Sequence, residues 1–290
     1  MKKILITGKG SYVGESFRNY INKYNTNYYV DVVSTINNEW ETVDFSKYDV
    51  VYNVAGIAHV DTKPSMESLY YEVNRDMPIK IANRAKKSGV KQFIHMSSMI
   101  VYGNMSKIGQ EKNIDLKTEP KPENFYGGSK LQADIGLRKL EDESFKVAII
   151  RPPLIYSERA IGNFPRLIKL SKILPIFPDI KNKQSMIYID NFCEFIKMVI
   201  DHEDNGTFYP QNKEYVSTTD MVVSVATNYK KKIYTTKLFN SLLKLLSKKV
   251  KIIDKAFGNL TYDMSISNHY DFKYCVVDFE ESIKKSCANK

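Results

Sequence analysis

The sequence predicts an α/β protein built on a doubly wound parallel sheet, with a smaller second lobe. In the first half of the chain, short apolar runs alternate with amphipathic segments, which is typical of parallel strands joined by crossover helices. The first apolar run ends directly in a glycine-rich turn. After Pro153 the periodic segments become shorter. We therefore expect a sheet domain over residues 1–153 and a second lobe over residues 154–290 that is interleaved with the last sheet elements.

The individual elements follow from the same periodicities. The predicted strands cover residues 3–7, 28–33, 49–54, 92–96 and 146–150. The predicted helices cover residues 12–24, 65–88, 125–140 and 191–202, and a further helix begins after Ser217. Gly89 stands where a helix C-terminus favours positive φ, and Ser217 precedes an apolar run as a helix cap does.

Composition excludes several classes of protein. The chain has 290 residues, 43% hydrophobic and 26% charged, as in ordinary globular proteins. Its three cysteines and four histidines are scattered, so the sequence predicts neither a disulfide framework nor a metal site. Apolar runs fall short of the ~20 residues of a membrane span, and the first breaks at once into a glycine turn, unlike a signal peptide. We therefore expect a cytoplasmic protein.

The net charge of +10 admits three interpretations: nucleic-acid binding, contact with anionic lipid, or a lysine-rich surface. The lysines are widely spread and no nucleic-acid motif is present, which favours the third. One stretch, residues 237–255, combines lysines with Leu238, Leu242, Leu245 and Leu246 on one helical face. It predicts an amphipathic helix packed on the second lobe, the commoner outcome, with weak association with a membrane surface as the alternative.

A dinucleotide site is predicted at the first turn. Gly8, Gly10 and Gly14 follow a strand and open a helix, so backbone N–H groups there can hold a pyrophosphate. Counting on from the turn to the end of the second strand leads to Ser34, with no acidic residue clearly at the tip, and Asp31 lies inside the strand. Nothing there repels a 2′-phosphate, which slightly favours NADP(H) over NAD(H), and both stay open.

A proton-transfer device is predicted further along. Tyr126 and Lys130 are four residues apart and lie on one helix face. The lysine charge is expected to stabilise tyrosinate and lower the pKa of the phenol. With a nearby serine hydroxyl, such a pair serves alcohol and ketone chemistry.

These motifs together resemble the extended short-chain dehydrogenase/reductase family, also described as NAD-dependent epimerase/dehydratases, which act on nucleotide sugars. The resemblance rests on the glycine turn, Tyr126 with Lys130, and the segments 53–56, 97–103, 151–156 and 185–191. It implies a Rossmann-type fold and, by family analogy, a homodimer. It implies that Ser98, Tyr126 and Lys130 are catalytic. Implied cofactor contacts are Gly8, Gly10, Ser11, Tyr12, Val13, Gly14, Ser34, Ala55, Gly56, Asn74, Tyr126, Lys130 and Pro153. Implied substrate contacts are Ser98, Met99, Tyr126, Asn163, Phe164, Lys183 and Gln184.

Two positions depart from the family pattern. Ser11 stands where the family usually has glycine, so its β-carbon is expected to shift the pyrophosphate or the turn. Gln184 stands where an arginine often holds the nucleotide diphosphate, and Lys183 or Arg159 are the candidates to supply that charge.

Segments 162–167, 174–178 and 256–260 resemble a narrower group of bacterial capsule and O-antigen enzymes. This resemblance implies a C4 reductase that acts on UDP-4-keto-6-deoxy-N-acetylglucosamine with NAD(P)H. The alternatives are a 4-epimerase of UDP-hexoses or UDP-N-acetylhexosamines with bound NAD, and a non-catalytic nucleotide-binding family member. A 4,6-dehydratase commonly has an Asp-Glu pair after the serine, whereas Met99 and Ile100 follow Ser98 here.

Overall fold

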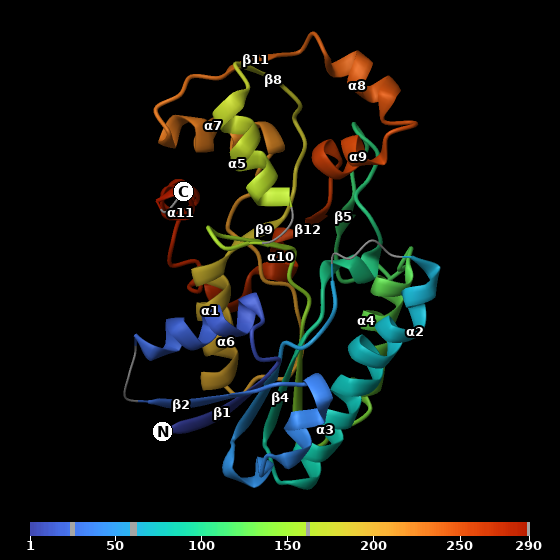
Figure 1. Ribbon diagram of the computed structural model, residues 1–290, viewed down its shortest axis with the longest axis vertical. Coiled ribbons are helices and arrows are strands. Elements are labelled where there is room, and N and C mark those ends of the chain that lie inside the picture. Colours follow the sequence, from blue (N-terminus) through green and yellow to red (C-terminus); the bar gives the residue numbers. More distant parts are fainter. Residues whose placement is uncertain (24–26, 59–62, 161–162, 289–290) are drawn as a thin grey trace. The chain divides into compact units, whose positions relative to one another are not determined.

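The computed structural model describes residues 1–23, 27–58, 63–160 and 163–288 (Figure 1). The chain forms two compact units, and each unit is assembled from separate stretches of sequence. The first unit comprises residues 1–103, 119–152 and 192–210. The second comprises residues 104–118, 153–191 and 211–290.

The first unit contains a six-stranded parallel sheet in the order β10-β6-β4-β3-β1-β2. The strand order reverses between β1 and β3, which is the arrangement of a doubly wound sheet and confirms the predicted fold class. All five predicted strands are present within a residue of their predicted ends. The strands are β1 (Lys2–Thr7), β2 (Tyr28–Val33), β3 (Val50–Asn53), β4 (Gln92–Met96), β6 (Lys146–Ile150) and β10 (Gly206–Phe208).

Helices cover both faces of this sheet because alternate strand residues point to opposite sides. On one face, Leu5, Val51 and Phe93 pack with Ala82 and Leu137 of two helices. On the other face, the rings of Phe17 and Tyr52 pack edge to face, with their centroids 5.3 Å apart. Figure 1 shows α1 and α6 on one side of the strands and α3 and α4 on the other. The helices are α1 (Tyr12–Asn22), α2 (Glu67–Tyr71), α3 (Met77–Lys87), α4 (Phe125–Arg138) and α6 (Ile189–Asp201).

The helix expected over residues 65–88 is interrupted. Between α2 and α3 the residues Glu72–Asp76 form a π-helical turn, η4, which widens the backbone by one residue and commonly occurs at functional sites. Gly89 has φ +79° and ends α3 as predicted. The helix expected over residues 12–24 ends at Asn22, and its predicted last residue, Tyr24, lies outside the described residues. Short 3₁₀ turns complete the unit: η1 (Ile36–Thr42), η2 (Phe45–Lys47), η3 (Pro64–Met66) and η5 (Met99–Tyr102).

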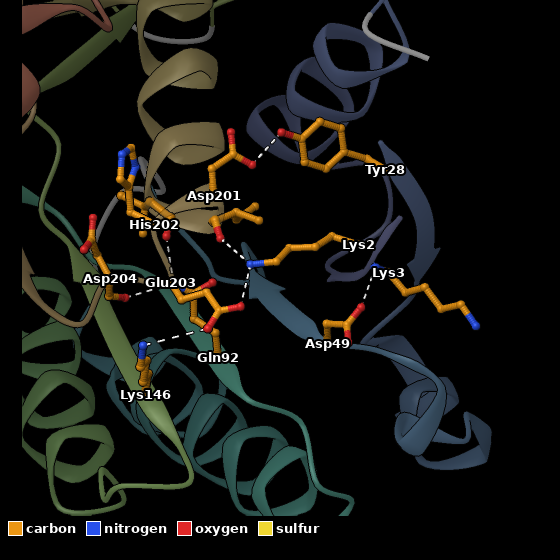
Figure 2. A network of polar contacts seen from close by, with 12 residues as sticks. Lys2, Lys3, Tyr28, Asp49, Gln92, Lys146, Asp201, His202, Glu203 and Asp204 are labelled. Atoms are coloured by element: carbon orange, nitrogen blue, oxygen red, sulfur yellow. Dashed lines mark hydrogen bonds and ion pairs between the residues drawn. The ribbon is translucent and has the colours of Figure 1, made fainter. Parts of the chain in front are cut away.

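The corner after α6 is tied to the amino ends of the strands (Figure 2). Glu203 has φ +51° and accepts a hydrogen bond from the Lys2 ammonium at 2.8 Å. The Lys146 ammonium lies 3.9 Å from the same carboxylate. The amide of Gln92, which is buried, donates to the backbone oxygens of Val199 and Asp204. These contacts fix where β10 begins beside β6.

The second unit is built from three pairs of short parallel strands and several helices. Its strand pairs are β5 (Asn113–Ile114) with β12 (Thr261–Tyr262), β7 (Leu154–Tyr156) with β9 (Met186–Tyr188), and β8 (Ile176–Pro178) with β11 (Tyr234–Thr236). Its helical elements are α5 (Asn163–Ile173), α7 (Thr218–Asn228), α8 (Asn240–Leu246), α9 (Lys251–Phe257), α10 (Met264–Ser267), η6 (His269–Phe272) and α11 (Phe279–Cys287). Ser217 caps α7 as predicted.

One segment differs from the boundary expected at residue 153. Residues 104–118 lie within the range assigned to the sheet domain but belong to the second unit. The reason is strand pairing, because Asn113 and Ile114 pair with Thr261 and Tyr262 near the other end of the chain. Within the described ranges, no helix is both long and apolar enough to cross a lipid bilayer.

Candidate active site

The glycine turn lies between β1 and α1 and needs its glycines for different reasons. Gly8 has φ +119°, and a β-carbon there would come within 2.8 Å of the Ala55 backbone nitrogen. Gly10 has φ +80° with open space around it. A β-carbon on Gly14 would meet the Ser11 hydroxyl at 2.7 Å. The turn therefore packs closely against the Ala55 backbone at Gly8, whereas the space next to Gly10 is open.

Ser11 fits this turn without backbone strain. Its φ of −69° is an ordinary extended value, so glycine is not required there. Its hydroxyl accepts a hydrogen bond from the Gly14 nitrogen at 3.0 Å and caps α1. The positive φ that the turn needs is supplied one residue earlier, at Gly10.

This turn fits a dinucleotide pyrophosphate. The helix N-terminus presents backbone N–H groups and a partial positive charge, and the space around Gly10 leaves room for a ligand. At the end of β2, the Ser34 hydroxyl accepts a hydrogen bond from the Ile36 nitrogen. Asp31 is occupied inside the strand, where the Tyr48 hydroxyl donates to it at 2.7 Å. Residues 8, 10 and 11–14 would hold the pyrophosphate, and Ser34 lies where the adenine ribose is expected.

Ser98 and Tyr126 come together at the carboxyl end of β4. Ser98 caps η5 by accepting a hydrogen bond from the Ile100 nitrogen at 3.2 Å. Tyr126 lies in the first turn of α4, which Asn124 caps through the Gly127 nitrogen at 2.8 Å. Burial raises the pKa of Tyr126 to about 12, against a hydrogen bond with Ser98 that acts to lower it.

Lys130 makes a backbone hydrogen bond that its spacing from Tyr126 did not predict. Its ammonium donates to the Met96 backbone oxygen at 2.8 Å, so it anchors α4 to the end of β4. Burial lowers the pKa of Lys130 to about 8, against Asp134, which acts to raise it. The predicted lowering of the Tyr126 pKa by this lysine is therefore not observed, because desolvation dominates at both groups.

Behind Lys130 lies a buried group of charged side chains. Burial raises the pKa of Asp134, and Arg151 and Ser97 oppose that effect. The Asp134 carboxylate accepts hydrogen bonds from the Arg151 guanidinium and the Ser97 hydroxyl, each at 2.9 Å. Burial depresses the pKa of His95, so its ring is neutral. This group fixes the serine loop, the lysine helix and the end of β6 to one another.

Gly56 lies next to both the Asn74 side chain and the Lys130 ammonium. The Asn74 side chain is fully buried in the π-helical turn η4, and it exchanges hydrogen bonds with the backbone N–H and oxygen of Ile57 at 2.9 and 3.1 Å. A β-carbon on Gly56 would come within 3.0 Å of the Asn74 amide oxygen and 3.1 Å of the Lys130 ammonium. A side chain at position 56 would therefore push the lysine or the asparagine aside by a few tenths of an ångström.

Sequence reasoning missed Asp134 and gave Arg151 no role. The signal for Asp134 was available, because Tyr126, Lys130 and Asp134 repeat at four-residue spacing on one helix face. Its partner Arg151 is 17 residues away in sequence, so the pair could not be recognised from local pattern.

The expected substrate residues of the second unit have varied environments. Phe164 is buried with its ring 5.4 Å from Tyr156, and Asn163 begins α5 but its side chain lies outside the described part. The Gln184 amide is buried and donates to the backbone oxygens of Ala256 and Gly258. It therefore serves as an internal brace. Lys183 and Arg159 are exposed, and Arg159 lies 3.6 Å from Glu158.

The remaining expected contacts lie at strand ends and turns. Ala55 is buried and its nitrogen donates to the Thr7 oxygen. Met99 is also buried, and its nitrogen donates to the Pro152 oxygen beside Pro153. Tyr12 and Val13 form the first turn of α1. These positions stay predictions as ligand contacts.

A family model described as the NAD dependent epimerase/dehydratase family matches residues 4–211. The chain belongs to this family. The matched region includes the glycine turn, Ser98, Tyr126 and Lys130, so the dinucleotide that this turn fits is the nicotinamide cofactor of an NAD-dependent enzyme.

Two curated relatives are 4-epimerases. UDP-glucose 4-epimerase from Vibrio cholerae is 36% identical over 233 residues, which cover 74% of this chain and 69% of the relative. N-acetyl-alpha-D-glucosaminyl-diphospho-ditrans,octacis-undecaprenol 4-epimerase from Escherichia coli O157:H7 is 31% identical over 194 residues, covering 64% of this chain and 56% of that relative. The family resemblance therefore extends over most of this chain, and the alignment to the second relative spans little more than half of that protein.

The fold is shared with solved family structures. UDP-glucuronic acid 4-epimerase from Bacillus cereus, solved with NAD, superposes with a TM-score of 0.73 at 18% identity and covers 99% of this chain and 97% of its own. At that identity the likeness establishes the Rossmann-type fold.

Proposed function

We propose that this protein is a nucleotide-sugar 4-epimerase that transfers hydride and proton at C4 of a UDP-linked sugar. The observation that carries the proposal is the packing of the turn that begins after Ser98 against the first turn of α4, which contains Tyr126, with buried Lys130 tying α4 to the end of β4. The epimerase assignment is supported by the two curated relatives, both of which are 4-epimerases.

The chain's own residues account for the proton. Tyr126 takes the proton of the C4 hydroxyl during oxidation and returns it when the C4 ketone is reduced on its other face. The Ser98 hydroxyl donates a hydrogen bond to the C4 oxygen as negative charge develops there. Lys130 holds α4 against β4 through its hydrogen bond to the Met96 oxygen. When bound, NAD supplies the acceptor and donor of the hydride.

A C4 reductase remains the second candidate, because the same serine, tyrosine and lysine serve a single reduction of a 4-keto sugar. A 4,6-dehydratase is disfavoured by the residues after the serine. Met99 and Ile100 stand there, and Met99 is buried in η5, so no carboxylate is offered at these positions for elimination.

The two candidates differ in whether the reaction consumes reduced cofactor, and the test measures that consumption. Purified protein is given UDP-glucose or UDP-N-acetylglucosamine, and the sugar products are separated by chromatography. Formation of the C4 epimer without net change in reduced cofactor supports the epimerase. Failure to epimerise, with stoichiometric oxidation of NADH or NADPH by UDP-4-keto-6-deoxy-N-acetylglucosamine, overturns it in favour of the reductase. The dinucleotide released on denaturation identifies NAD or NADP.

Two tyrosine variants test the mechanism. Tyr126→Phe should reduce turnover by at least a hundredfold, as expected for loss of a general acid–base group. Tyr70→Phe is the matched control, since the Tyr70 ring lies 5.9 Å from that of Tyr126 and its hydroxyl has no hydrogen-bond partner among the described residues. It should change turnover by less than about threefold. Equal turnover in both variants would refute the role of Tyr126.

A further inference from the structure

The second unit exposes a concentrated set of large apolar side chains around α8. Leu238, Leu242 and Leu245 are 86%, 53% and 62% exposed. The spacing of Leu242, Leu245 and Leu246 places these three on one side of α8. The full set is Leu238, Phe239, Leu242, Leu245, Leu246, Val250 and Ile252. Figure 1 shows α8 at the periphery of the second unit, next to α9 in the chain.

The face of α8 that contains Leu242 and Leu245 does not pack against the rest of the second unit. The packing of α8 and α9 against the rest of their unit uses other residues. Leu243, Ile253 and Phe257 contact a cluster that includes Phe177 and Val222. The face containing Leu242 and Leu245 points outward, which is opposite to the commoner outcome expected from the sequence.

The longer segment that contains this set, residues 230–255, carries most of the net charge of the chain, and residues 237–255 alone carry half of it. Residues 230–255 contain nine lysines and a single acidic residue, Asp254, against a net charge of +10 for the whole protein. The Asp254 carboxylate is already used, because it accepts a hydrogen bond from the Ile108 nitrogen at 3.0 Å. In the described ranges, no ion pair involves the lysines at 237, 244, 248, 249, 251 and 255.

We propose that these apolar and lysine side chains of residues 237–255, here called the lysine–leucine surface, dock the protein on an anionic lipid bilayer. Leucine and phenylalanine side chains enter the boundary between headgroups and acyl chains, and the surrounding ammonium groups contact anionic headgroups. This inference does not depend on which C4 reaction the protein catalyses.

Charge argues against a second copy of this chain as the occupant. A symmetric contact would place the same surface of both protomers together, and would bring two sets of unpaired lysines into a region of low dielectric. Mutual repulsion of these charges disfavours that contact. An anionic bilayer neutralises the same charges.

The probe is a vesicle of defined composition. The full-length protein is sedimented with vesicles of phosphatidylglycerol and phosphatidylcholine, or of phosphatidylcholine alone, in 50 mM NaCl. We expect binding to the anionic vesicles, at least tenfold weaker binding to the neutral ones, and loss of most binding in 0.5 M NaCl. Equal binding to both vesicle types, or none to either, overturns the proposal.

Variants locate the contact. Lys244→Glu/Lys248→Glu/Lys249→Glu should weaken binding by about a hundredfold or more, and Leu242→Glu/Leu245→Glu by at least tenfold. Matched controls are Lys117→Glu/Lys121→Glu and Leu116→Glu, the last at a leucine that is 78% exposed. The controls should bind as the wild type does.

Two further readouts keep the result interpretable. Turnover of a water-soluble UDP-sugar and the melting temperature should be unchanged in the surface variants, which shows that folding and chemistry are intact. Sedimentation equilibrium tests the other occupant. If Leu242→Glu/Leu245→Glu converts a dimer to a monomer and leaves vesicle binding unchanged, the surface is a contact between copies and the proposal is wrong.

Discussion

Replacement of Lys130 by methionine should abolish turnover and at the same time stabilise the folded protein at neutral pH. Methionine has a similar length and carries no charge. Lys130 is almost fully buried, and burial lowers the pKa of its ammonium from 10.5 to about 8. At pH 7 the folded protein nevertheless holds the lysine in its charged form.

The magnitude follows from this pKa difference. A tenfold change in proton affinity corresponds to about 1.4 kcal/mol, so retaining the charged amine in the folded state costs about 3 kcal/mol at pH 7. The variant also loses the hydrogen bond from the ammonium to the Met96 oxygen, which costs about 1 kcal/mol. The net expectation is an increase of about 2 kcal/mol in the free energy of unfolding.

The pH dependence gives this prediction its sign. The folded pKa is lower than the unfolded one, so the unfolded chain binds more protons between about pH 8 and 10.5. The stability of the wild type therefore rises with pH through that window. Since Lys130→Met has no such group, its advantage should shrink by about 2 kcal/mol between pH 7 and pH 9.5.

Urea unfolding followed by far-ultraviolet circular dichroism at both pH values measures these differences. Lys139→Met, at an exposed lysine that follows the same helix, is the matched control and should change stability by less than about 0.5 kcal/mol. A Lys130→Met protein that is less stable than the wild type at pH 7, or whose advantage is the same at pH 9.5, would refute the reasoning.

Three other changes have defined outcomes. Gly56→Ala places a β-carbon 3.1 Å from the Lys130 ammonium, so kcat should fall at least tenfold with little change in melting temperature, and an unchanged kcat would contradict the packing described. Asp134→Asn leaves the buried Arg151 guanidinium without its charge partner and should destabilise the protein by about 3 kcal/mol, measured by urea unfolding. If Arg151→Met does not recover part of that loss in the double variant, the two residues are not coupled. Lys2 and Lys146 lower the pKa of Glu203, so this carboxylate stabilises the fold above its unfolded pKa and the effect is lost as pH falls. Glu203→Gln should lower stability by under about 1 kcal/mol at pH 7 in low salt and by nothing measurable at pH 3, and an equal loss at both pH values would contradict an ionic role.

Much of the sheet unit could be predicted because its signals are local. The strands at residues 28–33, 92–96 and 146–150 have the predicted ends. Each is a short apolar run between turn residues, and burial on both faces keeps such runs intact. The helix end at Gly89 and the helix cap at Ser217 also follow from the conformation or hydrogen bond of a single residue.

The features that were missed depend on partners far away in the chain. The two-residue strand at Asn113 and Ile114 exists because residues 261 and 262 pair with it, and its own sequence carries no strand pattern. Asp134 also depends on a distant partner, because its buried carboxylate accepts a hydrogen bond from Arg151. The hydrogen bond from Lys130 to the Met96 oxygen depends on how α4 packs on β4, which spacing along a helix does not determine.

The discontinuous make-up of the first unit has a consequence for the nascent chain. Synthesis from the N-terminus delivers Ser98, Tyr126 and Lys130 early, but β6 gains its outer neighbour only when Gly206–Phe208 emerge. Until then β6, with the apolar sequence Val147–Ile150, is an unprotected edge that can pair with other chains. A fragment that ends near residue 153 would keep this open edge permanently and should aggregate. A continuous N-terminal fragment therefore cannot serve as an isolated nucleotide-binding domain. Such a domain would also need the β10 strand, fused so that it pairs with β6.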